Sequence, residues 1–151
     1  LNHTIDNVKD PDAGILIKYD CRMDFAKNAK SVLLNAVLLR YFENNPFIAT
    51  HRVLPVEFPY KFQYTYFINV ALPGNMKVDG LSQPLSIELE GGAASYRKTT
   101  AFYEGINTVA LNDVLSVDAA SHDVDKYNAM REFFQTVIDD NNQVLTLKRS
   151  E

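Results

Sequence analysis

One cysteine and three histidines are the residues best suited to nucleophilic catalysis. A cysteine nucleophile needs a histidine base beside it. Cys21 lies on the apolar phase of an alternating segment, and the residues around it form no recognisable nucleophile motif. We therefore interpret Cys21 as a buried, inert thiol. As the single cysteine of the chain, it also excludes an internal disulfide and a multi-cysteine metal site.

The three histidines lack the spacing of metal ligands. His3 lies in a polar N-terminal stretch, His51 in a loop and His122 just before an amphipathic segment. No two of them fall at the separations that zinc sites use. Surface or capping roles are the favoured interpretation. We predict no metal site, no cofactor and no catalytic residue.

Paired carboxylates are a second candidate for chemistry. Asp20 and Asp24 share the polar phase of one segment, and Asp139-Asp140 crowds the end of another. Calcium needs an acidic loop with a central glycine, and no stretch has that form. We interpret both pairs as solvated surface. Gly91-Gly92 lacks the further glycines and the lysine of a phosphate-binding loop, so it predicts a hairpin turn.

Aromatic side chains offer another route to a binding site. The chain has eight tyrosines and nine phenylalanines. Exposed rings could stack on a sugar or a peptide. The favoured interpretation is that Tyr64 and Tyr66 are core residues with their hydroxyl groups at the rim. The candidates for an exposed binding face are Tyr60, Phe67, Tyr96 and Tyr103. Such a face could equally be a surface that contacts another domain.

Length and charge limit the class of protein. At 151 residues the chain has the length of one domain with one core. A net charge of −4, with lysine and arginine scattered, argues against a nucleic-acid partner. The longest aliphatic runs are far shorter than a membrane span. The chain begins at Leu1 and shows no signal peptide, as expected of a processed protein or an excised fragment.

Hydrophobic periodicity predicts the elements of the first part of the chain. Residues 1–13 are polar and poorly patterned, so we expect a poorly ordered arm. Period-two alternation from Ile15 to Phe25 predicts a half-buried strand. Lys27–Lys30 is expected to turn the chain. Val32–Phe42 is nearly all apolar. A strand covered on both faces is the favoured interpretation there, and a buried helix is the competing one.

A series of strands is predicted for the rest of the chain. The clearest runs from Gln63 to Leu72 and has an apolar face that includes Tyr64 and Tyr66. Further strands are expected at Met76–Val78, Leu85–Leu89, Ala94–Tyr103, Val109–Val117 and Val144–Lys148. Asp113 interrupts the apolar face of its strand. A bulge or a strand end there would let the carboxylate reach water.

A change of period marks the predicted helix, residues 124–139. Its apolar residues fall three and four apart: Tyr127, Met130, Phe133, Phe134, Val137 and Ile138. Ser121 or Asp123 could cap its start. The predicted fold is therefore mostly β. We expect a β-sandwich, Ig-like or related, of about seven to nine strands with one amphipathic helix near the C-terminus, forming a single domain over residues 14–149.

The order of landmarks in the second half of the chain resembles a known family. The landmarks are Asn45-Pro46-Phe47, Arg52, Pro55-Val56, Tyr60, a strand ending Leu72-Pro73-Gly74, the Tyr96–Tyr103 strand, Tyr127 to Ile138 and Val144–Lys148. Together they look like the C-terminal β domain of the bacterial transglutaminase-like proteins known as DUF3857/DUF3858 proteins, common in Bacteroidetes. The resemblance is strongest over residues 44–149. The turn departs from the family, since Leu-Pro-Gly-Asn-Met replaces the more usual Leu-Pro-Glu-Gly-Tyr.

This resemblance implies an arrangement of three parts. An N-terminal β domain precedes a papain-like transglutaminase core with a Cys-His-Asp triad, and a β domain like this one follows. The triad belongs to the middle domain, so no catalytic residue carries over to this sequence. Such proteins are typically exported, which implies an extracytoplasmic location in the periplasm or at the cell surface.

Two functions are compatible with these observations. The favoured one is a non-catalytic accessory domain that packs on, or positions substrate for, a transglutaminase- or protease-like domain of the same polypeptide. The alternative is a free-standing cell-surface module that binds carbohydrate or peptide.

Overall fold

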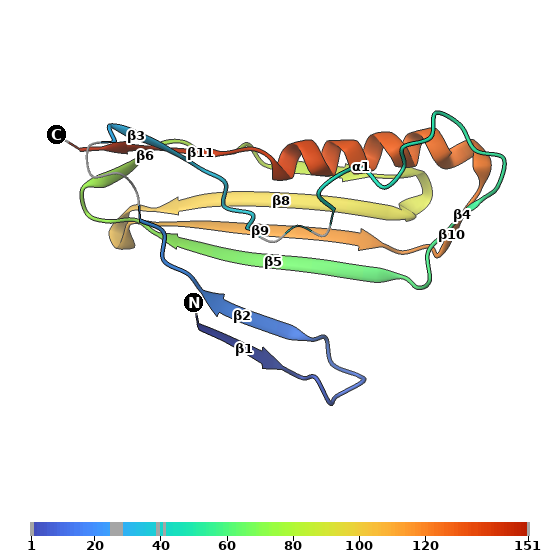
Figure 1. The fold of residues 1–151 in the computed structure, drawn as a ribbon, viewed down its shortest axis with the longest axis horizontal. Coiled ribbons are helices and arrows are strands. Elements are labelled where there is room, and N and C mark those ends of the chain that lie inside the picture. The colour runs from blue at the N-terminus through green and yellow to red at the C-terminus, as the bar shows by residue number, and fades with distance from the viewer. Residues whose placement is uncertain (1, 25–28, 39, 41, 151) are drawn as a thin grey trace.

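The computed structural model describes residues 2–24, 29–38, 40 and 42–150. This part of the chain contains eleven strands and one α-helix near the C-terminus, so the predicted mostly β fold class is confirmed (Figure 1). The strands exceed the predicted number because the structure adds a strand at Asn2–Asp6 and a pair of two-residue strands, Val56–Glu57 and Ser121–His122. The predicted turn at Lys27–Lys30 lies partly outside the described residues.

Four antiparallel strands form the main sheet, in the order β5-β9-β8-β7. They are β5 (Phe62–Ala71), β7 (Leu85–Glu88), β8 (Ala94–Tyr103) and β9 (Thr108–Val117). Period-two alternation predicted all four, because more buried and less buried residues alternate along each strand. The sheet therefore has one packed face and one face turned to solvent, as is common for antiparallel sheets.

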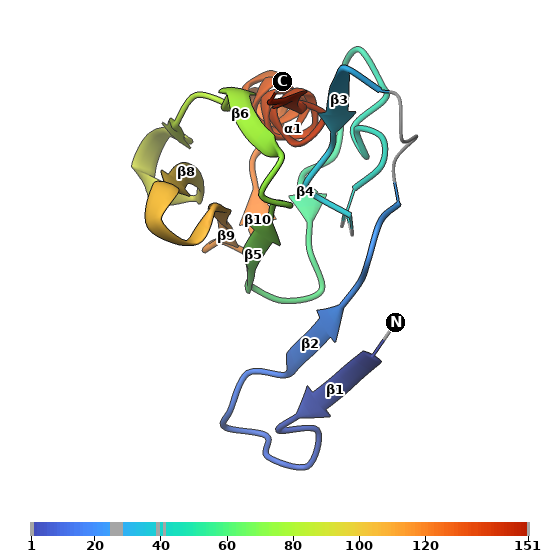
Figure 2. The same ribbon diagram turned by 90° about the vertical axis from the view of Figure 1, so that its left-hand side faces the viewer.

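Two elements cover the packed face, one after the other along its length (Figure 1). One is α1 (Tyr127–Asn141). The other is a three-stranded sheet, β3-β11-β6, made of β3 (Ser31–Leu34), β6 (Met76–Gly80) and β11 (Leu145–Arg149). Figure 2 looks along this layer, with α1 behind the small sheet. The second layer is thus part helix and part sheet, with β11 following α1 along the same layer.

The predicted apolar stripe of the helix is confirmed. Its six members are buried: Tyr127, Met130, Phe133, Phe134, Val137 and Ile138. All of them except Ile138 pack with residues of the main sheet in one hydrophobic cluster that includes Leu115 and Val117. A second cluster lies under the small sheet and includes Leu111, Leu145 and Leu147. The core therefore consists of two hydrophobic clusters, one under α1 and one under the small sheet, which follow each other along the main sheet.

Short elements connect these layers. β4 (Val56–Glu57) pairs with β10 (Ser121–His122). The described part of the chain also contains three 3₁₀ turns, η1 (Glu90–Gly92), η2 (Glu104–Ile106) and η3 (Val124–Lys126). Gly91 and Gly92 have φ angles of 78° and 72°, so the predicted turn uses left-handed backbone that glycine adopts without steric cost.

The predicted helix cap is wrong. The helical segment begins as η3, and the side chain of Asp123 makes no capping hydrogen bond there. Ser121 lies in β10, paired with Glu57, too early in the chain to cap α1. The apolar stripe, which packs on the main sheet, is what fixes this helix in place.

The N-terminal region corrects two predictions. Residues 2–6, expected to be a poorly ordered arm, form β1 (Asn2–Asp6), which pairs with β2 (Leu16–Asp20). The half-buried strand predicted from Ile15 to Phe25 is reduced to β2, and Ile17 is 55% exposed. The alternation was real, but the β1–β2 hairpin lies clear of the main body, so its apolar face meets no core in this chain (Figures 1 and 2).

The apolar run Val32–Phe42 is neither a doubly covered strand nor a buried helix. It begins as β3, in which Val32 and Leu34 are buried while Leu33 is 68% exposed. Ala36 and Val37 are buried in irregular backbone. Leu39 and Tyr41 lie outside the described residues. β3 is covered on one face only because it belongs to the small sheet, an outer layer that packs on the core with one face.

Candidate functional site

Three of the four candidate aromatic residues are exposed. Tyr60, Phe67 and Tyr103 are 65%, 76% and 54% exposed. Tyr96 is 1% exposed, so its prediction as part of an exposed face is wrong. The reason is strand phase, because Tyr96 and Lys98 both point from β8 into the packed side of the sheet.

These exposed rings do not form one platform. Phe67 of β5 lies opposite Asn112 of β9, which lies opposite Thr99 of β8. Tyr103 lies four residues beyond Thr99 on β8, so roughly 16 Å separates the two aromatic positions. Tyr60 precedes β5, at the end of the sheet opposite to Tyr103. A sugar or peptide that stacks on adjacent rings finds no such pair here.

Cys21 and the histidines are placed apart from any nucleophile arrangement. Cys21 is exposed, so the predicted burial is wrong, because the linker after β2 does not enter the core. His3 and His51 are exposed as predicted. His122 is 6% exposed, and its Nε2 lies 2.9 Å from the carbonyl oxygen of Ala119.

The residues of the two carboxylate pairs differ in exposure. Asp20, Asp24 and Asp139 are exposed, in agreement with the prediction of solvated surface. Asp140 is 4% exposed, which contradicts that prediction. Within residues 2–24, 29–38, 40 and 42–150, no group of three histidine, cysteine, aspartate or glutamate side chains could hold a metal ion.

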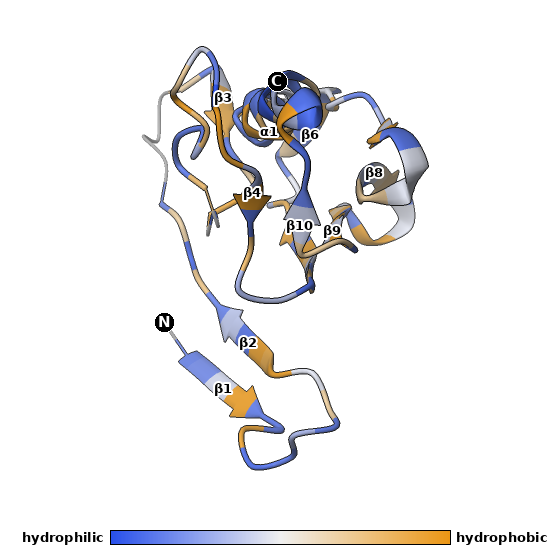
Figure 3. Cartoon of the chain, turned by 90° about the vertical axis from the view of Figure 1, so that its right-hand side faces the viewer, coloured by the Kyte–Doolittle hydropathy of each residue, from blue (hydrophilic) through white to orange (hydrophobic). Residues whose placement is uncertain are grey.

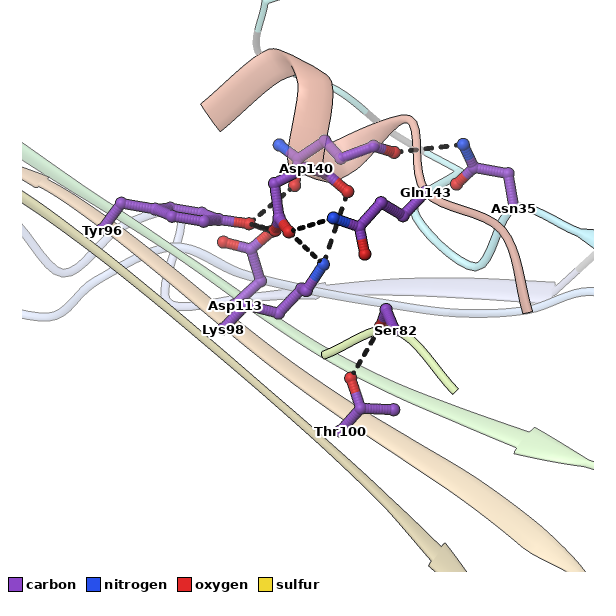
Figure 4. Close-up of polar contacts among 9 residues, drawn as sticks. Asn35, Ser82, Tyr96, Lys98, Thr100, Asp113, Asp140 and Gln143 are labelled. Atoms are coloured by element: carbon purple, nitrogen blue, oxygen red, sulfur yellow. Dashed lines mark hydrogen bonds and ion pairs between the residues drawn. The ribbon is translucent and has the colours of Figure 1, made fainter. Parts of the chain in front are cut away.

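A buried polar cluster joins the C-terminal end of α1 to the main sheet (Figure 4). The Nζ of Lys98 lies 2.6 Å from Oδ1 of Asp140. The Tyr96 hydroxyl lies 2.7 Å from Oδ2 of Asp140, 3.1 Å from Oδ2 of Asp113 and 2.9 Å from Oδ1 of Asn141. The cluster lies between the two hydrophobic clusters, since Asp113 falls between Leu111 and Leu115 on β9.

Asp113 corrects a sequence prediction. Its strand has neither a bulge nor an end at this position, because the register with β5 and β8 is continuous. The carboxyl group is 2% exposed and does not reach water as expected. Burial is the first cause that raises its pKa to about 6; the charge of Asp140 adds to this effect, and Lys98 and Tyr96 oppose it.

The hydrogen count of the cluster explains why Asp113 holds a proton readily. The Tyr96 hydroxyl carries one hydrogen but faces three acceptor oxygens. A protonated Asp113 would supply a second hydrogen to these acceptors. The one remaining carboxylate, that of Asp140, would then face the one ammonium group, that of Lys98. Burial and the neighbouring carboxylates raise the pKa of Tyr96 far above its usual range, so its hydroxyl stays protonated.

Access to this cluster is too narrow for a substrate. The cavity beside it has a volume of about 10 Å³ and is lined by residues that include Tyr64, Tyr66, Asp113 and Asn141. That space holds about one water molecule. The cluster therefore positions α1 on the sheet and has no room for a reaction on a bound molecule.

The sequence did contain a signal for this cluster. Lys98 falls on the apolar phase of β8 and Asp113 on the apolar phase of β9. The short connection between these strands places the two residues directly opposite each other. A charged residue on each inward phase, in matching register, indicates a buried polar pair.

A larger hollow lies at the open side of the two layers. This groove has a volume of about 630 Å³. One wall is the C-terminal half of β5. The other is formed by Asp20, the last residue of β2, and by the linker residues 21–24 that follow it. Its apolar lining includes Leu34, Leu38, Ile68, Val70, Leu72, Met76 and Leu147. The groove and the adjoining hairpin are the surfaces with the size and chemistry to contact another polypeptide.

Comparison with known families shows the kind of domain that carries these surfaces. A family described as a domain of unknown function with a solved structure, DUF3858, matches residues 30–147. The chain belongs to the DUF3858 family. The match covers the two packed layers and leaves out the N-terminal hairpin.

This DUF3858 domain shares its fold with part of a larger protein. The crystal structure of a "putative protease" from Parabacteroides distasonis superposes with a TM-score of 0.56 at 16% sequence identity. The superposition covers 67% of this chain and 19% of the other, so the chain spans less than a fifth of that protein's length. No curated protein matches the sequence. Among the described residues, no helix has the length and apolar character to cross a bilayer.

Proposed function

We propose that this chain is a non-catalytic accessory domain of an exported transglutaminase- or protease-like polypeptide. In this role it packs on the catalytic domain of the same polypeptide, or positions substrate for it, in the periplasm or at the cell surface. The family match and the likeness to one part of a larger "putative protease" support the proposal.

The observation that carries the proposal is the uncovered apolar face of the N-terminal hairpin. Ile5 of β1 lies opposite Ile17 of β2, and the two are 50% and 55% exposed. His3 shares that face, since it lies two residues before Ile5 on β1, and it is exposed as well. Apolar residues gather at the end of β1 and the beginning of β2, clear of the body (Figure 3).

The opposite face of the hairpin is mostly polar, with Leu16 as its apolar residue. Lys18 and Asp6 form an ion pair of 2.9 Å there, and Thr4 lies opposite Lys18. An isolated two-stranded hairpin is marginally stable in water, so an amphipathic one gains stability when its apolar face is covered. A neighbouring domain would provide that cover.

Two steps test this proposal. Reading the gene on both sides of this segment comes first. A transglutaminase-like or protease-like domain in the same frame, behind an export signal, is the expected result. A short gene that encodes only this domain would contradict the accessory role.

The second step measures association between the separately expressed catalytic domain and this chain by isothermal titration calorimetry. Ile17→Lys should weaken binding at least tenfold, because it places a charge on the apolar face. Lys18→Ala, on the polar face, is the matched control and should bind as the unmodified chain does. Equal affinity for Ile17→Lys would show that the hairpin is not the contact.

The alternative, a free-standing module that binds carbohydrate or peptide, has less support. It needs adjacent exposed rings, and Phe67, Tyr103 and Tyr60 lie at separate places on the sheet. Saturable glycan binding that Phe67→Ala or Tyr103→Ala abolishes would favour this alternative instead.

A further inference from the structure

β5 is an edge strand with an open side. It spans ten residues, and among the described residues β9 is the one strand that pairs with it. The ladder with β9 runs without interruption from Phe62 to Ala71. The other side of the β5 backbone therefore faces no strand of the described residues.

The backbone phase of β5 follows from one hydrogen bond at its end. The N–H of Leu72 donates to the carbonyl oxygen of Asn107 over 2.8 Å, which continues the ladder by one pair. Hydrogen-bonded pairs alternate with non-bonded pairs in an antiparallel ladder. Ile68 and Val70 therefore bond to β9. Phe67, Asn69 and Ala71 direct one N–H and one carbonyl oxygen each to the open edge.

This edge lacks the features that usually protect an exposed strand. Its sequence, FQYTYFINVA, has no charged residue, no proline and no glycine. The other edges differ, because β3 and β7 are only four residues long and β6 carries Lys77 and Asp79. Long uncharged edge strands are sites where another strand pairs.

The groove provides space for the side chains of such a strand. It adjoins the open edge at residues 68–72, where Ile68, Val70 and Leu72 form its apolar wall. Leu34 and Leu147 line it from the small sheet. Every second side chain of an added strand would enter this hollow, and the others would face solvent.

The position of the hairpin indicates which kind of partner could pair with the open edge of β5. In both views the β1–β2 hairpin lies beyond β5, on the side where the open edge faces, and β2 is its nearer strand (Figures 1 and 2). A second copy pairing through its own β5 would extend a whole sheet into the position of the hairpin. A single extended strand needs only the position next to β5.

The geometry points to strand addition as the way in which the catalytic neighbour docks. One extended segment of that domain, alternating apolar and polar residues, pairs with the backbone of Phe67, Asn69 and Ala71 and fills the groove. Main-chain hydrogen bonds give such contacts affinity, and the pockets for alternate side chains give specificity. The inference rests on the proposed accessory function, because that proposal supplies the partner, a catalytic domain of the same polypeptide.

Two variants of one residue test this inference, each made in the 151-residue chain and mixed with the separately expressed catalytic domain. Asn69→Pro removes an edge N–H that makes no bond to β9, so the ladder is retained while strand addition is blocked. Asn69→Ala changes the same side chain but keeps the N–H. Association of the separately expressed catalytic domain should fall at least tenfold with Asn69→Pro and remain within twofold with Asn69→Ala. Both variants should unfold at the same denaturant concentration as the unmodified chain.

Amide hydrogen exchange provides a measurement that needs no substitution. The amides of Phe67, Asn69 and Ala71 should exchange rapidly in the 151-residue chain and become protected at least a hundredfold in the full polypeptide. The amides of Ile68 and Val70, bonded to β9, should be protected in both and act as internal controls.

The outcomes separate this inference from the proposed function. If the two domains associate but Phe67, Asn69 and Ala71 stay unprotected, strand addition is wrong and the accessory role stands. If the domains do not associate at all, the accessory role itself fails. If Asn69→Pro alone unfolds the chain, the exchange measurement on the unmodified polypeptide still decides the question.

Discussion

The ammonium nitrogen of Lys98 lies 2.6 Å from Oδ1 of Asp140, and their side chains are 1% and 3% exposed. Lys98 belongs to the centre of β8 and Asp140 to the last turn of α1. The pair therefore connects the two layers at the point where the two hydrophobic clusters separate. Both desolvated charges depend on each other, since neither has access to bulk water.

Breaking this pair should be strongly destabilising. Lys98→Met leaves the Asp140 carboxylate buried without a counter-charge, so the free energy of unfolding should fall by about 3–5 kcal/mol. Adding Asp140→Asn removes the unpaired charge and should recover a large part of that loss. Urea denaturation measures both. Lys18→Ala, which breaks an exposed pair with Asp6, should cost less than about 1 kcal/mol. Similar losses for the two lysines would contradict the role of the buried pair.

Asp113 should make stability depend on pH. Its folded-state pKa is raised from 3.8 to about 6, so the folded state keeps a proton that the unfolded state has already released between these values. The contribution of Asp113 is therefore full below pH 4 and is lost as pH rises toward 6. The loss is at most about 3 kcal/mol.

Asp113→Asn is the variant that tests this, because it keeps the shape of the side chain but cannot ionise. The difference in unfolding free energy between Asp113→Asn and the unmodified chain should shift in favour of the variant from pH 4 to pH 7. Asp139→Asn, at an exposed position, is the control. Parallel pH curves for Asp113→Asn and the unmodified chain would show that Asp113 does not titrate in this range.

Phenylalanine positions should differ sharply in their effect on stability. Phe134 of α1 is 0% exposed and packs against Phe47 with ring centroids 5.1 Å apart. Phe134→Ala should lower the free energy of unfolding by about 3–5 kcal/mol because it leaves a cavity in the core. Phe67→Ala, 76% exposed, should change it by less than about 0.5 kcal/mol. A large cost for Phe67→Ala in this chain alone would mean that the outer face of β5 is covered.

Cys21 should react with thiol reagents in the native state. It is the one cysteine of the sequence and lies exposed in the linker after β2. A disulfide reagent such as Ellman's reagent should therefore titrate one equivalent without denaturant. In the full polypeptide, slower labelling is expected if the neighbour covers this linker. Labelling of the 151-residue chain that requires denaturant would show that Cys21 is buried after all.

Much of the fold could be predicted from local sequence pattern. The strands of the main sheet and the stripe of α1 have periods of two and of three to four, and these periods depend on the residues of one element. The structure confirms β5, β8 and β9 nearly to the residue. The same local logic failed for Val32–Phe42, because coverage of a strand is decided by its place in the sheet.

The candidate site depended on tertiary structure to a greater degree. Alternation in Ile15–Phe25 predicted an apolar face, but which body covers that face is decided by elements far away in the sequence. The sequence analysis interpreted Asp139-Asp140 as solvated surface. Asp140 is buried instead, because the last turn of α1 places it against Lys98. The open edge of β5 could not be predicted from hydrophobic pattern or composition. It results from the strand order of the sheet, in which β5 is the outermost strand.

The sequence by itself therefore determined which faces of its strands and helix are apolar, since each residue's side of an element follows from its number. Tertiary structure decided which of those faces are covered, which charges lose water and which strand stays unpaired. The physical reason is that burial and pairing are relations between elements distant along the chain. The hydrophobic period of a single element therefore cannot predict burial or strand pairing.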